Sequence, residues 1–230
     1  MIELKNLRKS YFSGDTETIA LRDVSLSISA GEFIAVMGPS GCGKSTLMNV
    51  LGMIDTPSDG QYLFNGADIS NYGESQLVDL RKNNLGYIFQ SFNLIDDLSV
   101  EDNIALPLKY LGLNKKRRKA RVREALELVG LAHRAQHKPS QLSGGQQQRA
   151  AVARAIIVDP KLILADEPTG NLDSQNGAEV MELLHLLNAQ GSTILMVTHS
   201  KENAKEAQRV VQMLDGRVVS ADEHGSELNA

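Results

Sequence analysis

Hydrophobic positions along the 230-residue chain follow two alternating patterns. Short unbroken apolar runs at Phe33–Met37, Leu162–Ala165 and Ile194–Val197 are typical of strands that are buried on both faces. Between such runs, one stretch repeats apolar residues at i, i+3, i+4, i+7 spacing, which predicts a helix with a single apolar stripe. The residues of this stripe are Val180, Leu183, Leu184 and Leu187. Alternating strands and helices predict an α/β fold with a mostly parallel sheet.

Two other regions depart from this pattern. Period-two alternation at Val24, Leu26 and Ile28, and again around Tyr62 and Phe64, predicts a small antiparallel sheet beside the parallel core. Near the end of the chain, the apolar segments 210–214 and 217–219 flank a dipeptide suited to a tight hairpin turn, Asp215-Gly216.

Residues 96–159 carry almost no strand signal. Apolar residues recur at helical spacing from Val122 to Val129, and Ala150–Ile157 is an alanine-rich helix former. We therefore expect a helical subdomain, at about 96–159, inserted between two strands of the core. The whole chain, 1–230, is expected to be one domain, with about 1–95 and 160–230 forming the core and its β subdomain.

Composition excludes several classes of protein. With 42% hydrophobic and 23% charged residues, the chain is typical of a globular protein and unlike a disordered or collagen sequence. Its one cysteine, Cys42, excludes an internal disulfide, and the first residues lack a secretory signal, so we expect a cytoplasmic location. No apolar run approaches the ~20 residues of a membrane span. The pI of about 5.8 argues against a general nucleic-acid binder.

A glycine-rich segment directly follows the apolar run Phe33–Met37. It matches the phosphate-loop pattern G-x-x-x-x-G-K-[ST], and a helical run follows it. Glycines let the backbone turn its N–H groups onto phosphates, and the helix start adds its positive dipole end. Lys44 is expected to bind phosphate oxygens and Ser45 to ligate Mg²⁺. The residues expected to contact nucleotide here are Gly38, Pro39, Ser40, Gly41, Cys42, Gly43, Lys44, Ser45 and Thr46.

Two adjacent carboxylates follow the apolar run Leu162–Ala165. Ligands bind at the carboxyl ends of strands in open α/β sheets, so Asp166 is expected to coordinate Mg²⁺ through water. Glu167 points elsewhere and is expected to orient or deprotonate an attacking water, which predicts hydrolysis. Taken alone, the pair could also be a solvated acidic turn.

A third motif, Leu142-Ser143-Gly144-Gly145-Gln146, begins another helix-forming run and predicts a second anion-binding helix start. With it the chain closely resembles the ATP-binding-cassette ATPases, the nucleotide-binding subunits of ABC transporters. The resemblance covers nearly all of the chain and keeps the order of the family's motifs. These are the phosphate loop at 38–46, Gln90 after a strand, the signature at 142–146, Asp166-Glu167, Asn171-Leu172-Asp173 and His199.

The resemblance implies ATP and Mg²⁺ as cofactors and a head-to-tail homodimer. In that dimer, Ser143, Gly144, Gly145 and Gln146 of one protomer close over the γ-phosphate that Lys44 of the other protomer holds. The resemblance also implies roles for single residues. Gln90 reaches metal and water, His199 contacts the γ-phosphate and helps to position Glu167, and Asp173 lies at the dimer seam.

Three further features lead to separate expectations, and two of them have an alternative interpretation. Tyr11 resembles the family's aromatic residue that stacks on adenine, although it could be an ordinary sheet residue. Cys42 stands beside Lys44 and a helix start, and we predict that alkylation of its thiol blocks ATP binding. The basic run Lys115–Arg123 is either a solvated helix face or a contact for anionic lipid head groups.

Within the family, the motif wording most resembles the lipoprotein-release and macrolide-export branch. That resemblance implies a separate membrane permease, received by the segment from Gln90 to about Pro107, and a peripheral location on the cytoplasmic face of the cell (inner) membrane. We expect no nucleic-acid partner. The alternatives are an amino-acid-type importer, a soluble ABC ATPase acting on DNA or ribosomes, a regulatory scaffold and, least favoured, a phosphotransferase.

Overall fold

A computed structural model of the chain describes residues 1–223 and confirms the α/β fold. The chain forms two compact units, and each has its own strands and helices. Unit 1 consists of Met1–Arg81 together with the segment that begins at Thr193, and unit 2 is Lys82–Ser192. The chain passes from unit 1 to unit 2 within helix α2 (Glu74–Asn84).

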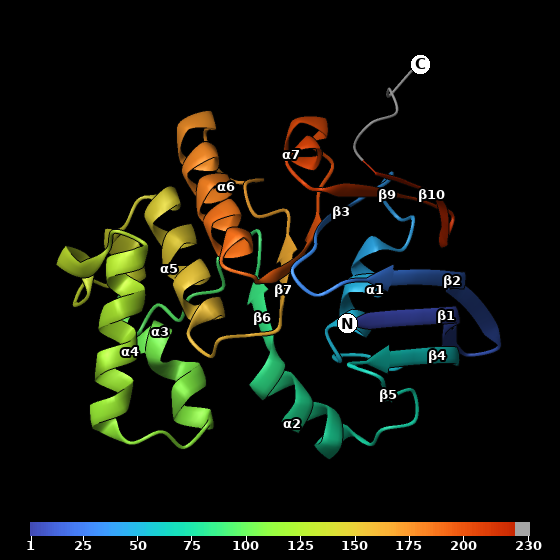
Figure 1. The fold of residues 1–230 in the computed structure, drawn as a ribbon, viewed down its shortest axis with the longest axis horizontal. Coiled ribbons are helices and arrows are strands. Elements are labelled where there is room, and N and C mark those ends of the chain that lie inside the picture. The colour runs from blue at the N-terminus through green and yellow to red at the C-terminus, as the bar shows by residue number, and fades with distance from the viewer. Residues whose placement is uncertain (224–230) are drawn as a thin grey trace. The chain divides into compact units, whose positions relative to one another are not determined.

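Unit 1 contains the predicted antiparallel sheet, with strand order β2-β1-β4-β5 (Figure 1). The strands are β1 (Ile2–Ser13), β2 (Thr16–Ile28), β4 (Asp59–Phe64) and β5 (Ala67–Asp68). The apolar positions that predicted this sheet, Val24, Leu26, Ile28, Tyr62 and Phe64, are all buried. Because alternate residues of a strand face opposite sides, this burial fixes the register of the sheet.

Unit 1 also contains parallel strands. Strand β3 (Phe33–Met37) pairs in parallel with β8 (Thr193–Val197) on one side and with β9 (Arg209–Leu214) on the other. Strand β10 (Arg217–Glu223) returns antiparallel to β9 through the predicted turn. In that turn Asp215 and Gly216 have φ values of 46° and 79°, as a tight hairpin of this kind requires. The helices are α1 (Lys44–Leu51) and α7 (Lys201–Lys205).

The other elements of unit 2 pack around one alanine-rich helix. Helix α5 (Gly144–Ile156) packs against α3 (Val100–Tyr110), α4 (Lys115–Leu128), α6 (Ser174–Ala189) and strand β6 (Leu85–Ile88), and Figure 1 shows these helices side by side. Its small buried side chains, from Ala150 to Ala153, let these neighbours approach closely. Strand β6 pairs in parallel with β7 (Leu162–Asp166). Two short 3₁₀ helices, Ala132–Arg134 and Pro139–Gln141, precede α5.

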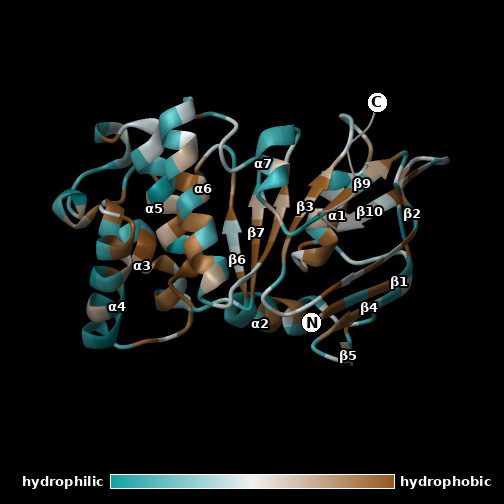
Figure 2. Cartoon of the chain, turned by 45° about the horizontal axis from the view of Figure 1, so that its top comes forward, coloured by the Kyte–Doolittle hydropathy of each residue, from teal (hydrophilic) through white to brown (hydrophobic). Residues whose placement is uncertain are grey.

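Hydropathy follows this arrangement. Figure 2 shows β3 and β7 as mainly hydrophobic, whereas α4 is hydrophilic over much of its surface. The residues of β3 from Phe33 to Val36 and of β7 from Leu162 to Ala165 are almost completely buried, as expected for strands covered on both faces. Within residues 1–223, no helix combines the length and the apolar character needed to cross a bilayer.

Candidate nucleotide site

The predicted phosphate loop connects β3 to α1 in unit 1. Gly41 and Gly43 have φ values of 79° and 100°, and among the described residues nothing accepts a hydrogen bond from their N–H groups. Lys44 folds across the loop, where its Nζ donates to the carbonyl oxygens of Gly38 (2.8 Å) and Pro39 (2.9 Å). A loop that ends in a helix start and offers free N–H groups beside a lysine has the donor set that binds phosphate.

The β9–β10 turn supports the phosphate loop directly. The N–H of Gly216 donates to the carbonyl of Cys42 (3.0 Å), and the carbonyl of Gly216 accepts from the N–H of Arg22 (2.7 Å). Because a trans peptide group points its C=O and N–H in opposite directions, fixing the Cys42 carbonyl also fixes the N–H of Gly43. The hairpin therefore helps to set the direction of a predicted phosphate donor.

His199 follows β8 at the same edge of the sheet as the phosphate loop. Val36 of β3 pairs with Val197 of β8, so Gly38 and His199 each lie two residues beyond a paired position. The N–H of Thr198 donates to Val36 O at 3.1 Å, which extends this pairing by one residue. The imidazole is exposed at this edge. Unit 1 thus brings together the phosphate loop and His199, as expected for residues at the carboxyl ends of neighbouring parallel strands.

Tyr11 belongs to a small polar cluster in unit 1. Its hydroxyl donates to Asp55 Oδ2 (2.8 Å), and Lys9 Nζ donates to Asp55 Oδ1 (2.5 Å) while lying 5.0 Å from the Tyr11 ring centroid. Burial and the hydrogen bond to Asp55 raise the pKa of Tyr11, against a smaller lowering by the hydroxyl of Thr46, the last residue of the phosphate loop. The residue is 41% exposed. Tyr11 is therefore an anchored, accessible aromatic surface beside the phosphate loop.

Unit 2 repeats this arrangement of strand ends. Ile88 of β6 pairs with Ala165 of β7, so Gln90 and Glu167 each lie two residues beyond a paired position. Gln90 Nε2 donates to Asn171 Oδ1 (3.2 Å), and Asn171 Nδ2 donates to the carbonyl of Gln90 (3.0 Å). The structure thus brings Gln90, the Asp166-Glu167 pair and Asn171 to one edge of unit 2.

The signature motif forms a capped helix start in the same unit. The hydroxyl of Ser143 accepts from the N–H of Gln146 (3.3 Å), and Gln146 Oε1 accepts from the N–H of Ser143 (3.1 Å), which makes a capping box. Among residues 1–223, nothing accepts from the N–H groups of Gly144 and Gly145. The helix start can therefore bind an anion through these N–H groups.

The second glycine of the signature also has a packing role. A Cβ at Gly145 would overlap the side chain of Asn176 on α6. Asn176 in turn donates both its N–H (2.9 Å) and its side-chain amide (2.7 Å) to Asp173, the N-cap of α6. Hydrogen bonds from the backbone and side chain of Asn176 lower the pKa of Asp173. The predicted seam residue therefore also caps a helix that packs on the signature.

Three residues are expected to hold Mg²⁺ together with the nucleotide. Within residues 1–223, no three His, Cys, Asp or Glu side chains gather into a group that could hold a metal ion. The predicted ligands Ser45, Gln90 and Asp166 supply a hydroxyl, an amide and a carboxylate, all of them oxygen donors that suit Mg²⁺. Mg²⁺ at nucleotide sites usually completes its coordination with phosphate oxygens and water, and these residues fit that chemistry.

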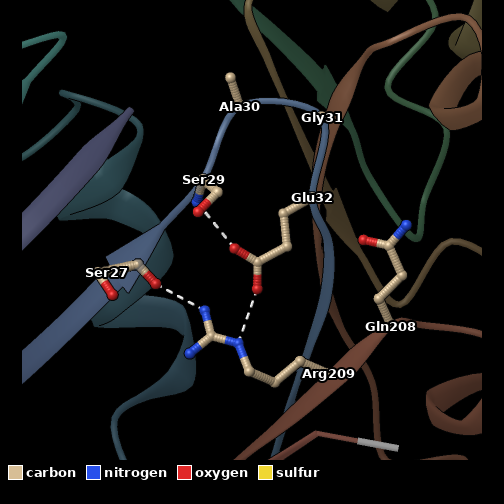
Figure 3. A pocket seen from close by; sticks show the side chains of 7 residues that line it. All are labelled: Ser27, Ser29, Ala30, Gly31, Glu32, Gln208 and Arg209. Atoms are coloured by element: carbon tan, nitrogen blue, oxygen red, sulfur yellow. Dashed lines mark hydrogen bonds and ion pairs between the residues drawn. The ribbon is translucent and has the colours of Figure 1, made fainter.

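A polar pocket of about 590 Å³ lies at the opposite end of β3 from the phosphate loop. Figure 3 shows the Glu32 carboxylate between the Ser29 N–H (2.8 Å) and Arg209 Nε (2.7 Å), while Arg209 Nη2 donates to Ser27 O (2.6 Å). The ion pair is largely shielded, with 15% and 17% of the two side chains exposed. The two charged side chains of this pocket pair with each other, so their role here is to connect the end of β2, the residue before β3 and the start of β9.

The structure shows where Cys42 and the basic run 115–123 lie. Cys42 is buried, with its Sγ 3.9 Å from Lys44 Nζ, so reagents reach the thiol only when the loop opens. The predicted block of ATP binding by alkylation stays a prediction. The basic run 115–123 forms the first two turns of α4 and is mostly exposed, although Val122 is buried. Its lipid contact also stays a prediction.

The sequence carries no signal for the polar partners of the expected site. Lys9 and Asp55 carry no recognisable signal, because one lies on an alternating strand and the other in a loop. Gln148, which is completely buried and donates to Pro168 O at 2.5 Å, stands in a run of three glutamines that predicts only helix. Periodicity cannot single out such residues, since their partners are distant in sequence.

Known proteins similar to this chain agree with the motifs. The family model described as "ABC transporter" matches residues 21–170. An uncharacterized ABC transporter ATP-binding protein, YknY of Bacillus subtilis, is 48% identical, and the match covers 96% of each chain. The macrolide export ATP-binding/permease protein MacB of Bdellovibrio bacteriovorus is 46% identical over the whole of this chain. The chain spans only 35% of the length of that relative.

Solved structures agree as well. The dimeric, post-hydrolysis structure of the ATP-binding cassette MJ0796 bound to ADP and Pi has a TM-score of 0.90 and 39% identity, and the match covers 99% of this chain and 100% of that one. The cbiO1 protein of Clostridium perfringens, part of the ABC transporter complex cbiONQ, has a TM-score of 0.87 and 30% identity, over 96% of this chain and 88% of that one. The chain therefore belongs to the ABC transporter family, as one of its ATP-binding, ATP-hydrolysing cassettes.

Proposed function

We propose that this cassette dimerises head to tail on ATP and drives a separate membrane permease of the lipoprotein-release, macrolide or peptide export type. The macrolide export relatives support the export direction, since they match the chain at 45–50% identity. The Bacillus relative, an ATP-binding protein similar over nearly its full length, supports a permease on another chain. Attached to such a permease, the cassette lies on the cytoplasmic face of the cell (inner) membrane.

One observation supports the proposed dimer. The chain has two helix starts suited to phosphate, one after Gly43 and one after Ser143, and both offer N–H groups that no described residue uses. A single nucleotide per chain leaves the second start without a ligand. In a head-to-tail dimer, each signature start faces the nucleotide of the other protomer and stabilises transition-state charge in trans, much as an arginine finger does. The dimeric structures of a similar cassette support a dimer.

The proposed chemistry assigns a task to each site residue. The N–H groups of residues 38–46 and the ammonium of Lys44 bind the phosphates, and Tyr11 stacks on adenine. Glu167 takes the proton of the attacking water, and Gln90 and His199 orient water and γ-phosphate. Ser45, Gln90 and Asp166 hold Mg²⁺, which when bound neutralises the charge that develops on the phosphate oxygens.

Hydrolysis then performs work through the permease. We place the receiving surface in the segment from Gln90 to about Pro107, because it contains both a residue of the hydrolytic site and the first turns of α3. ATP favours the closed dimer and hydrolysis returns it to the open state, so the permease alternates between two conformations.

The partner can be identified directly. Tagged Glu167→Gln cassette is trapped with Mg-ATP in detergent-solubilised membranes of its host, and the co-purifying proteins are identified by mass. We expect a permease with four spans and a large extracytoplasmic domain. A six-span importer permease would overturn the export assignment, and recovery of ribosomal or DNA-bound proteins would overturn transport altogether. Lys44→Ala, which should not trap a complex, is the control.

A further inference from the structure

A buried glutamine joins the signature helix to the segment that carries Glu167. Gln148 lies one turn after Gly144 on α5, and its side chain is fully buried. Its Nε2 donates to the carbonyl oxygen of Pro168 at 2.5 Å. Pro168 directly follows Glu167, so one side chain connects the helix of the signature to the peptide next to the proposed base.

The segment that receives this hydrogen bond is a tight turn. The N–H of Gly170 donates to the carbonyl of Glu167 (3.0 Å), and Glu167 itself has a φ of 45°, a conformation that non-glycine residues rarely adopt. Such a conformation persists only where surrounding contacts hold it. Pro168 has no N–H to contribute, so its carbonyl is the group through which the body of the unit can hold the peptide after Glu167.

The orientation of the Gln148 amide follows from its partner. The Pro168 carbonyl can only accept, so the atom facing it must be the donor nitrogen. This leaves Oε1, which is buried and has no hydrogen-bond partner among the described residues. Burying an unsatisfied acceptor lowers stability, and a methionine of the same length would remove that acceptor but leave the buried Pro168 carbonyl without this donor. A buried exception of this kind calls for an explanation besides packing.

We propose that Gln148 is a positioning residue, which holds the Glu167 turn in its hydrolytic conformation and transmits the occupancy of the signature start to that turn. This inference rests on the proposed roles of Glu167 and of the signature. Gly144 and Gln148 lie on the same face of α5 because they are four residues apart. A shift of the helix start therefore moves the donor that holds Pro168.

The test compares two neighbouring glutamines in the full chain. Gln148→Met removes the donor and keeps the length of the side chain. Gln147→Met is the matched control, because Gln147 donates to Leu142 O (3.2 Å) and does not reach Pro168. For Gln148→Met we expect kcat to fall about tenfold, the worth of one hydrogen bond, with KM for ATP within about twofold. The unfolding midpoint should fall by no more than a few degrees, because the loss of the unsatisfied Oε1 offsets the loss of the donor to Pro168. The control should keep its kcat within about twofold.

A second measurement separates positioning from folding. In a Glu167→Gln background, adding Gln148→Met should lower the residual rate by less than about twofold, because a residue that acts through Glu167 has nothing left to position. Gln148→Asn, which keeps an amide but is one methylene shorter, should lose kcat like the methionine variant. An unchanged kcat in Gln148→Met, equal losses in both methionine variants, or a full further loss in the Glu167→Gln background would overturn the inference. Failure of the proposed function is separate, since it requires Glu167→Gln itself to hydrolyse ATP normally.

Discussion

Gln90 and Asn171 hold each other through two hydrogen bonds. The amide of Gln90 donates to Asn171 Oδ1 at 3.2 Å, and the amide of Asn171 donates back to the Gln90 carbonyl at 3.0 Å. The side chain expected to reach metal and water is therefore bound to the loop that follows Glu167. Gln90 would contact Mg²⁺ through Oε1, and Nε2 can keep its hydrogen bond to Asn171, so the two interactions are compatible.

This arrangement predicts a coupling between Gln90 and Asn171 that bound nucleotide does not abolish. We expect a double-mutant cycle of Gln90→Ala and Asn171→Ala to give a coupling of about 0.5–1.5 kcal/mol in the free energy of unfolding without nucleotide. In saturating Mg-ATP the coupling should stay within that range. Chemical denaturation of the four proteins measures both values. A coupling that falls to zero with Mg-ATP would mean that Gln90 gives up Asn171 when it contacts Mg²⁺.

The phosphate loop predicts the effect of Lys44→Ala. Its ammonium donates to two loop carbonyls in this structure and is the charged group that phosphates would meet. Since hydrogen bonds to charged groups are worth about 1.5–3 kcal/mol each, we expect ATP affinity to fall at least about a hundredfold. Titration with a fluorescent ATP analogue measures this loss. Retained affinity would contradict the phosphate-loop assignment.

The hairpin behind the loop predicts a difference between two glycines. Gly216 and Gly66 share a left-handed conformation, with φ of 79° and 82°, in similar hairpin turns. A Cβ would lie 2.7 Å from Ala20 O at Gly216 but meets nothing within 4 Å at Gly66. Replacing either by Ala should lower the unfolding midpoint by a few degrees, from about 1 kcal/mol of backbone strain. Only Gly216→Ala should also weaken ATP binding, by about tenfold, because it displaces Cys42 and Gly43. Equal ATP affinities in the two variants would refute this role.

Asp55 predicts a pH dependence of stability. Burial alone would raise the pKa of Asp55, but the hydrogen bonds from Lys9 and Tyr11 outweigh it and leave the pKa below its ordinary value. A carboxyl whose pKa is lowered by folding stabilises the folded state fully above its unfolded pKa of about 4. That stabilisation is lost as the pH falls through the lower, folded-state pKa.

The matched variant is Asp55→Asn. At pH 7 we expect its free energy of unfolding to be about 0.5–1 kcal/mol lower than that of the wild type, since the pair is only partly shielded. The difference should shrink steadily below pH 4. Urea unfolding at pH 7, 5, 4 and 3 measures it. A difference that stays constant down to pH 3 would show that the charge of Asp55 is not responsible.

Local patterns in the sequence were sufficient for most of the fold. The apolar runs that became β3, β7 and β8 appear within a residue of their predicted bounds, because strands buried on both faces must be continuously apolar. The Asp215-Gly216 turn was predicted because few residues tolerate its positive φ values. Helix α2 was missed, since Leu77 is its only buried residue among 74–84 and no apolar stripe marks it.

The residues of the candidate site also differ in how far the sequence could predict them. Residues in motifs that begin just after a strand, such as Lys44, Gln90 and Glu167, could be predicted, because the motif and the strand are adjacent in sequence. Residues that come into contact only when the chain folds could not be predicted. Asp55 meets Tyr11 across 44 positions and Gln148 meets Pro168 across 20, and neither separation leaves a periodic trace in the sequence.

The mass of the Glu167→Gln protein in solution tests most directly whether a head-to-tail dimer closes on ATP. This variant keeps the phosphate-binding groups and loses the proposed base, so we predict that sedimentation shows a monomer without nucleotide and a stable dimer with Mg-ATP. Adding Ser143→Arg, which places a bulky cation at the signature start, should return the protein to monomer with ATP still bound. A Glu167→Gln protein that binds Mg-ATP and stays monomeric would contradict the account.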